Sequence, residues 1–135
     1  MADVTITAAN VKLVTGTKAE ETAGEAMSAG TWIYKDATSK KMFKADCTNA
    51  SKDEVAGIAL TTADAADAPV VFAKDGAEID VGSVVTKAES YILSEAGKMA
   101  PVADLASSDY LTQLCYGKDA DTIVLAITNT TIQKA

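Results

Sequence analysis

The stretch VGSVVTKAESYILSEAGKMAPVAD, residues 81–104, decides the fold because much of its pattern already occurs between residues 24 and 46. Tyr91 and the Lys-Met pair that follows it stand at the same spacing as Tyr34 and its own Lys-Met pair. The similarity continues downstream at slightly smaller offsets, as expected when surface loops change length while strand register is kept. The pattern predicts two similar β units, about residues 24–76 and 77–129, in one domain. Chance similarity in an Ala- and Val-rich chain is the alternative.

Short runs of β-branched and aromatic residues recur along the chain between clusters of Gly, Asp and Ser. Runs of this length and spacing, without a long 3.6-residue period, are typical of a small all-β sandwich or barrel. The predicted strands are 31–35, 42–44, 55–62, 70–72, 78–81, 83–87, 91–93, 98–102, 111–116 and 122–129, and a frayed tail is expected over 130–135.

The first 18 residues, MADVTITAANVKLVTGTK, lie outside the repeat. Val4 and Ile6 alternate with threonines, and Val11 and Leu13 continue an extended, β-branched pattern. Residues 1–18 are therefore predicted to form an extended N-terminal arm on a single β domain of residues 19–135. Such a segment is either an edge strand of its own sheet or an arm that pairs with another molecule's sheet.

The composition excludes several classes of function. The 135 residues carry 12 Lys and Arg against 19 Asp and Glu, which gives a formal net charge of −7. This balance argues against binding to nucleic acid and to anionic membrane surfaces, because both need concentrated positive charge. The chain contains no histidine, so Ser-His-Asp and Cys-His catalysis and the usual zinc and iron sites are excluded. We expect no enzyme activity, no cofactor and no metal.

The remaining reactive residues also suggest structural roles. Cys47 and Cys115 belong to no CxxC pattern and are expected as free thiols rather than as a disulfide. Asp64 and Asp67 share one loop, where a calcium ion or an acid/base pair is conceivable, but solvated turn carboxylates are the expectation.

Two aromatic residues, Trp32 and Tyr34, lie in the predicted strand TWIYK. One face of this strand is expected to be exposed or to lie at an interface, where amphipathic aromatic side chains are favoured. Trp32 and Tyr34 are therefore candidate interface aromatics.

Four motifs together resemble the small capsid decoration, or cement, proteins of tailed bacteriophages. They are ADVTITAANV at 2–11, G-x-x-x-x-A-G-x-x-[IV]-Y-x-D at 24–36, VAGIAL at 55–60 and YILSEAGKMAPVADLASSDYLTQLCYG at 91–117. The resemblance implies a structural virion protein, made in the host cytoplasm, that binds the outer surface of the capsid. It implies the major capsid protein as partner, a homotrimer, and stabilisation of the expanded shell by bridging capsid subunits.

The resemblance also implies that an extended N-terminal segment joins a sheet of the capsid protein, which assigns Val4, Ile6, Val11 and Leu13 to capsid binding. It implies no catalytic residues. The second unit departs from the pattern because Glu89 stands where the first unit has Trp32, so which unit faces the shell stays open.

A second hypothesis comes from a different class of function. The chain could be a small β-barrel module of a phage fibre or tail that binds carbohydrate or peptide, with Trp32, Tyr34 and Tyr110 as its stacking surface. An aspartate-dependent hydrolase that uses Asp64 and Asp67 is a third and weaker hypothesis.

Overall fold

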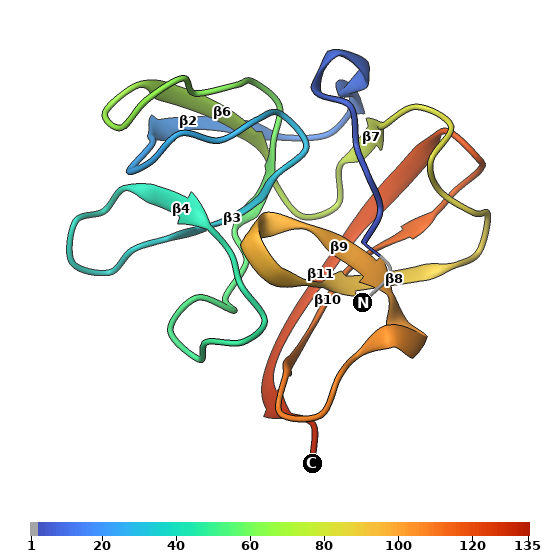
Figure 1. Ribbon diagram of the computed structural model, residues 1–135. Helices are drawn as coiled ribbons and strands as arrows, with labels where there is room; N and C mark the ends of the chain where they lie inside the picture. Colours follow the sequence, from blue (N-terminus) through green and yellow to red (C-terminus); the bar gives the residue numbers. More distant parts are fainter. Residues whose placement is uncertain (1–2) are drawn as a thin grey trace.

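The computed structural model describes residues 3–135 and consists of two antiparallel β-sheets packed as a sandwich (Figure 1). Helical structure within the described chain is limited to three 3-10 turns: η1 (Ala8–Asn10), η2 (Glu95–Gly97) and η3 (Val102–Asp104). The predicted all-β fold class is thus confirmed. Met1 and Ala2, the first two residues of the expected arm, lie outside the described residues.

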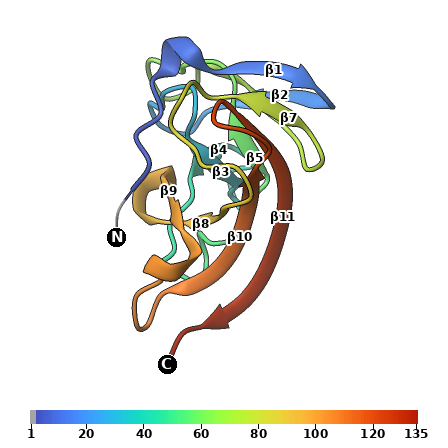
Figure 2. The same ribbon diagram turned by 90° about the vertical axis from the view of Figure 1, so that its right-hand side faces the viewer.

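One sheet has five strands and the other has six. The five-stranded sheet has the order β2 (Lys18–Thr22), β6 (Pro69–Ala73), β5 (Gly57–Ala59), β3 (Trp32–Lys35), β4 (Met42–Lys44). The six-stranded sheet has the order β1 (Lys12–Thr15), β7 (Glu78–Asp80), β11 (Thr122–Gln133), β10 (Tyr110–Gly117), β8 (Ser90–Leu93), β9 (Met99–Pro101). In Figure 2 the long β10–β11 hairpin runs down one side of the molecule towards the C-terminus.

The two sheets share one connectivity. Strands β2 to β6 lie in the order first, fifth, fourth, second, third, and strands β7 to β11 lie in the same order. Tyr34 in β3 and Tyr91 in β8 occupy the second strand of their respective sets. This shared topology is what a duplicated unit produces, and it includes β2, which precedes the start of the repeat seen in the sequence. Strand β1 is an addition at the edge of the second set.

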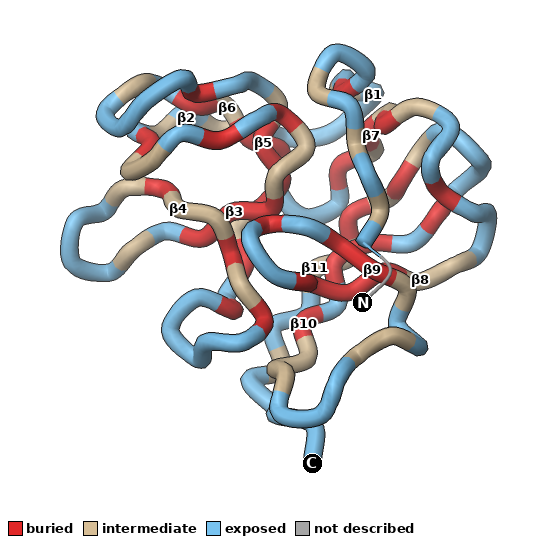
Figure 3. Tube along the Cα trace, in the orientation of Figure 1, coloured by how far each residue is buried: buried red, intermediate tan, exposed pale blue. Residues whose placement is uncertain are grey.

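The main hydrophobic core lies between the sheets. Trp32, Tyr34 and Ile58 enter it from the five-stranded sheet and pack with apolar residues of the six-stranded sheet, among them Leu93 and Leu125. In Figure 3 the buried residues follow β3, β5 and β9 through the centre of the molecule, whereas the projecting loops are exposed. Ala, Val, Ile and Leu supply most of this core, as the low aromatic content requires.

A second apolar cluster covers the other face of the five-stranded sheet. It contains Ala23, Met27, Ile33, Met42 and Phe72, with smaller residues between them. A parallel bridge joins Ala23, just after β2, to Met42 in β4, so that the two edges of this sheet meet. The sheet therefore curls around the cluster, and its central strands are buried on both faces.

Polar contacts connect the two halves of the chain. The hydroxyl of Thr112 donates to the carbonyl of Asp53 at 2.7 Å. The side-chain amide of Asn129 pairs with the main chain of Val55, accepting from its N–H at 2.9 Å and donating to its carbonyl at 3.3 Å. The N–H of Gly97 donates to the carbonyl of Ala45 at 2.6 Å. These hydrogen bonds provide partners for main-chain groups of Ala45, Asp53 and Val55, which lie outside the strands.

Two predicted strands and the predicted tail need correction. Residues 83–87 form a loop whose only ladder contact is a bridge from Lys87 to Gly117. The strand expected over 55–62 is reduced to Gly57–Ala59, because the main chain of Val55 bonds to the Asn129 side chain instead of to a strand. The tail does not fray at residue 130: β11 continues to Gln133, which pairs with Tyr110.

Candidate interaction site

The N-terminal segment, residues 3–7, lies in extended conformation across the outside of the domain. Figure 1 shows it running from beside β9 to η1, and Figure 2 shows the same path. Among the described residues, one main-chain hydrogen bond joins it to the body of the domain, from the N–H of Val4 to the carbonyl of Met99 at 2.8 Å. The carboxylate of Asp3 accepts from the Ser94 hydroxyl at 2.5 Å. The segment is therefore attached, but by few polar contacts.

Packing of the N-terminal segment depends on a glycine. Ile6 is half-buried and lies against Gly30, where an added Cβ would stand 2.7 Å from the Ile6 Cγ2. Gly30 also has a φ of +91°, a conformation that disfavours L side chains. Val4 is half-buried as well and packs against the main core. We call the surface formed by Gly30, Ser94 and Met99 the segment site.

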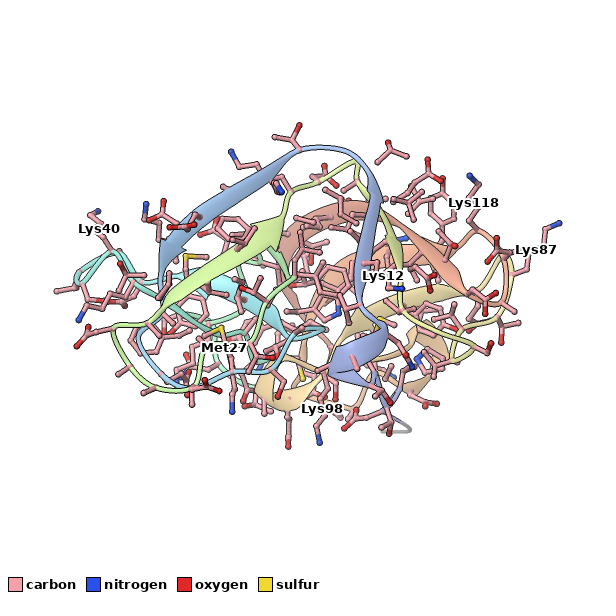
Figure 4. The ribbon with its side chains drawn as sticks, turned by 90° about the horizontal axis from the view of Figure 1, so that it is seen from above. Lys12, Met27, Lys40, Lys87, Lys98 and Lys118 are labelled. Atoms are coloured by element: carbon pink, nitrogen blue, oxygen red, sulfur yellow. The ribbon has the colours of Figure 1, made fainter. Side chains whose placement is uncertain are left out.

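A groove of about 570 Å³ adjoins the segment site. Its apolar lining includes the buried residues Met27, Ala29, Ala63 and Met99, and the N-terminal segment forms one wall. Asp3, Lys44, Asp64 and Lys98 also line it, so both signs of charge are present. In Figure 4 Met27 and Lys98 lie on the same side of the molecule, whereas Lys40 and Lys118 lie at opposite ends.

Over its described residues, 3–18, the expected arm is not a separate extension in this structure. Leu13 pairs with Ile79 in the β1–β7 ladder, and Val11 is only 9% exposed in the main core. Strand β1 is an edge strand of the chain's own sheet, which is one of the two alternatives that the sequence left open. Of the four residues assigned to capsid binding, only Val4 and Ile6 lie on the weakly attached segment.

The predicted interface aromatics are buried. Trp32 is 0% exposed and Tyr34 is 8% exposed, so the expectation of an exposed aromatic face is wrong. The cause is the position of β3, which has the main core on one face and the second cluster on the other. With these two rings inside, the stacking surface expected of a carbohydrate-binding module is not assembled around Tyr110.

Compared with models of protein families and with curated proteins, the chain matches none of them.

The candidate acid/base residues are placed as ordinary surface groups. Asp67 forms an exposed ion pair with Lys41 at 2.5 Å. Over residues 3–135 no three Cys, Asp or Glu side chains are grouped so that they could hold a metal ion. The same part of the chain contains no helix long and apolar enough to cross a membrane.

Both thiols are free and buried. Burial, followed by the charge of Asp109, raises the pKa of Cys47 to about 12. Burial alone raises the pKa of Cys115, whose sulfur lies 3.7 Å from that of Met99. A thiol with so high a pKa is protonated at neutral pH and is a poor nucleophile.

Sequence reasoning missed the buried carboxyl group of Asp53. The residue is 2% exposed, and its Oδ2 atom has no hydrogen-bond partner in the described structure. Burial raises the pKa of this carboxyl above its usual value, and the nearby Glu54 adds to the effect. The sequence offered no signal for it, because Asp53 lies in a polar stretch that reads as a solvated loop.

Proposed function

We propose that this protein binds the outer surface of an expanded phage capsid and stabilises the shell by bridging major capsid subunits. The motif resemblance supports this proposal, and so does a two-sheet body that carries an extended segment on its outside. The proposed location is the capsid exterior, after synthesis in the host cytoplasm. The role is mechanical and requires no catalytic residue.

The observation that carries the proposal is the weak attachment of residues 3–7. A single main-chain hydrogen bond joins the segment to the domain, and such a bond contributes about 0.5–1.5 kcal/mol net. Val4 and Ile6 are half-buried. Burial of each side chain therefore stabilises the docked segment by about 1 kcal/mol, half of what full burial of such a side chain provides. The hydrogen bond from the Ser94 hydroxyl to the Asp3 carboxylate adds about 1.5–3 kcal/mol because its acceptor is charged. Release of the segment therefore costs about 4–6 kcal/mol, which contacts with another chain must replace for intermolecular pairing.

A homotrimer is the proposed form on the shell. Modest binding by each copy is multiplied when three copies bind together, because the second and third contacts form at high effective concentration. Because the chain has a formal charge of −7, we assign the proposed binding to main-chain and apolar contacts rather than to attraction to acidic surfaces.

Sedimentation with expanded shells tests the proposal. The shells are assembled from the major capsid protein of the virus whose genome encodes this chain. We expect the wild-type protein to sediment with the shells in a fixed ratio and the double variant Val4→Asp/Ile6→Asp to stay in the supernatant. Val14→Asp is the matched control, since Val14 is an exposed apolar residue of β1. Wild-type protein that stays in the supernatant contradicts the proposal.

A further inference from the structure

We propose that the segment site of one copy receives the N-terminal segment of a second copy, so that neighbouring copies are linked by exchanged segments. The inference deepens the proposed function by naming the chain to which residues 3–7 pair when they leave their own domain: it is a neighbouring copy within the homotrimer, and the assembled trimer then binds the shell. It rests on the proposed function in one respect: a shell surface brings many copies close together.

The segment site is shown to fit this segment, because residues 3–7 already lie on it. Met99 offers the carbonyl for the N–H of Val4, Ser94 offers a hydroxyl to Asp3, and Gly30 leaves room for Ile6. Every copy carries both the segment and the site. Exchange between copies therefore remakes the same contacts and costs little beyond the loss of chain freedom.

A short hinge connects the segment to the domain. Two turn hydrogen bonds form η1, from Asn10 N–H to Thr7 carbonyl at 2.9 Å and from Val11 N–H to Ala8 carbonyl at 3.2 Å. Buried Val11 anchors the domain side of this hinge. If η1 opens, the eight residues 3–10 span about 27 Å when extended. That reach suffices for a neighbour whose segment site faces the hinge.

The exchanged contact is compatible with a closed ring. The segment and the segment site are different surfaces of one chain, so exchange passed from copy to copy runs head to tail and forms a trimer where the rotation between copies closes after three, whereas reciprocal exchange between two copies forms a twofold dimer. The groove of about 570 Å³ is lined on one side by the resident segment and adjoins the contacts that are exchanged. Residues 4–7 are uncharged, and the Asp3 carboxylate accepts a hydrogen bond from Ser94, so the contact itself places no two like charges together.

Engineered cysteines test the exchange directly. All variants carry Cys47→Ala and Cys115→Ala, because the Cys47 N–H bonds to the Ser94 carbonyl and the Cys115 sulfur lies 3.7 Å from that of Met99, so both native cysteines adjoin the segment site. One chain carries Asp3→Cys and another carries Ser94→Cys, and the two are unfolded, mixed, refolded together and oxidised. We expect a disulfide between the two chains at about 1 mM protein, near the effective concentration of a short tether, and little at micromolar concentration.

The matched control replaces Asp3→Cys with Thr5→Cys, since Thr5 is an exposed residue of the same segment. A chain with both Asp3→Cys and Ser94→Cys must close within itself at micromolar concentration, and its failure to do so overturns the docked geometry. Equal cross-linking of the Asp3→Cys and Thr5→Cys mixtures at 1 mM overturns the exchange. The readout uses no shells, so it separates this inference from the proposed function: cross-linking without shell binding leaves the exchange standing, and shell binding without cross-linking leaves the decoration role standing.

Discussion

Replacing Gly30 by alanine is predicted to loosen the N-terminal segment. The added Cβ would stand 2.7 Å from the Ile6 Cγ2 and 3.3 Å from a methyl group of Val11. The first distance is shorter than a normal carbon contact, so Ile6 has to move. Because Ile6 is on a segment with one main-chain bond, the segment is the part that gives way.

A second glycine isolates this effect. Gly30 has φ +91° and Gly76 has φ +86°, so alanine at either position meets a similar backbone penalty of about 1–3 kcal/mol. No atom lies within 4 Å of a Cβ built on Gly76. The difference between the two variants therefore reports the displaced contact. Loss of the half-buried Ile6 packing is worth about 1 kcal/mol.

Hydrogen exchange at the Val4 amide measures that difference. We expect the amide to exchange about five-fold faster in Gly30→Ala than in Gly76→Ala, which corresponds to about 1 kcal/mol. Global stability is followed in parallel by urea unfolding, so that local opening is separated from general destabilisation. Equal Val4 exchange rates in the two variants would refute the claim that Ile6 packing on Gly30 holds the segment in place.

Three further outcomes follow from buried residues. Asp53→Asn should raise the free energy of unfolding at pH 7 by about 1–3 kcal/mol, because it removes an unpaired buried charge. The folded-state pKa of Asp53 is raised, so the charged carboxylate destabilises the wild-type protein above that pKa, and this loss of stability disappears as the pH falls through it. Urea titrations from pH 7 to pH 4 should therefore show the unfolding free energies of the two proteins becoming equal. A constant difference between the two free energies would contradict this. Cys47 and Cys115 should resist a thiol reagent at pH 8 until guanidinium unfolds the chain, whereas rapid labelling of the folded protein would show that they are accessible. Trp32→Ala should lower the free energy of unfolding by about 3–5 kcal/mol, and Trp32→Phe by much less because the indole N–H has no partner to lose; a glycan array with Trp32-dependent binding would contradict the burial of this ring.

The fold class followed from the sequence because strand spacing and apolar runs are local signals. The equivalent positions of Tyr34 and Tyr91 indicated two units, and both residues lie in the second strand of a set with shared connectivity. Trp32 was misplaced because alternation alone does not reveal a strand that is covered on both faces. The covering residues, Ala23 and Met27, precede β3 and look like a loop in the sequence.

The candidate site was predictable only in part. Val4, Ile6 and Leu13 have the same alternating pattern in the sequence, but their roles depend on distant partners. Leu13 finds Ile79 in a ladder, whereas Val4 finds a single carbonyl at Met99. Main-chain pairing over long sequence separation is set by the whole fold, so the local pattern did not separate the anchored part of the expected arm from the releasable one.

The resistance of expanded shells to heat tests the central claim most directly. Scanning calorimetry of shells with saturating protein is predicted to show a higher disruption temperature than shells alone, because bridged subunits must separate before the shell fails. Shells mixed with Val4→Asp/Ile6→Asp should behave like shells alone. An unchanged disruption temperature with the wild-type protein present at saturation would contradict the proposed role.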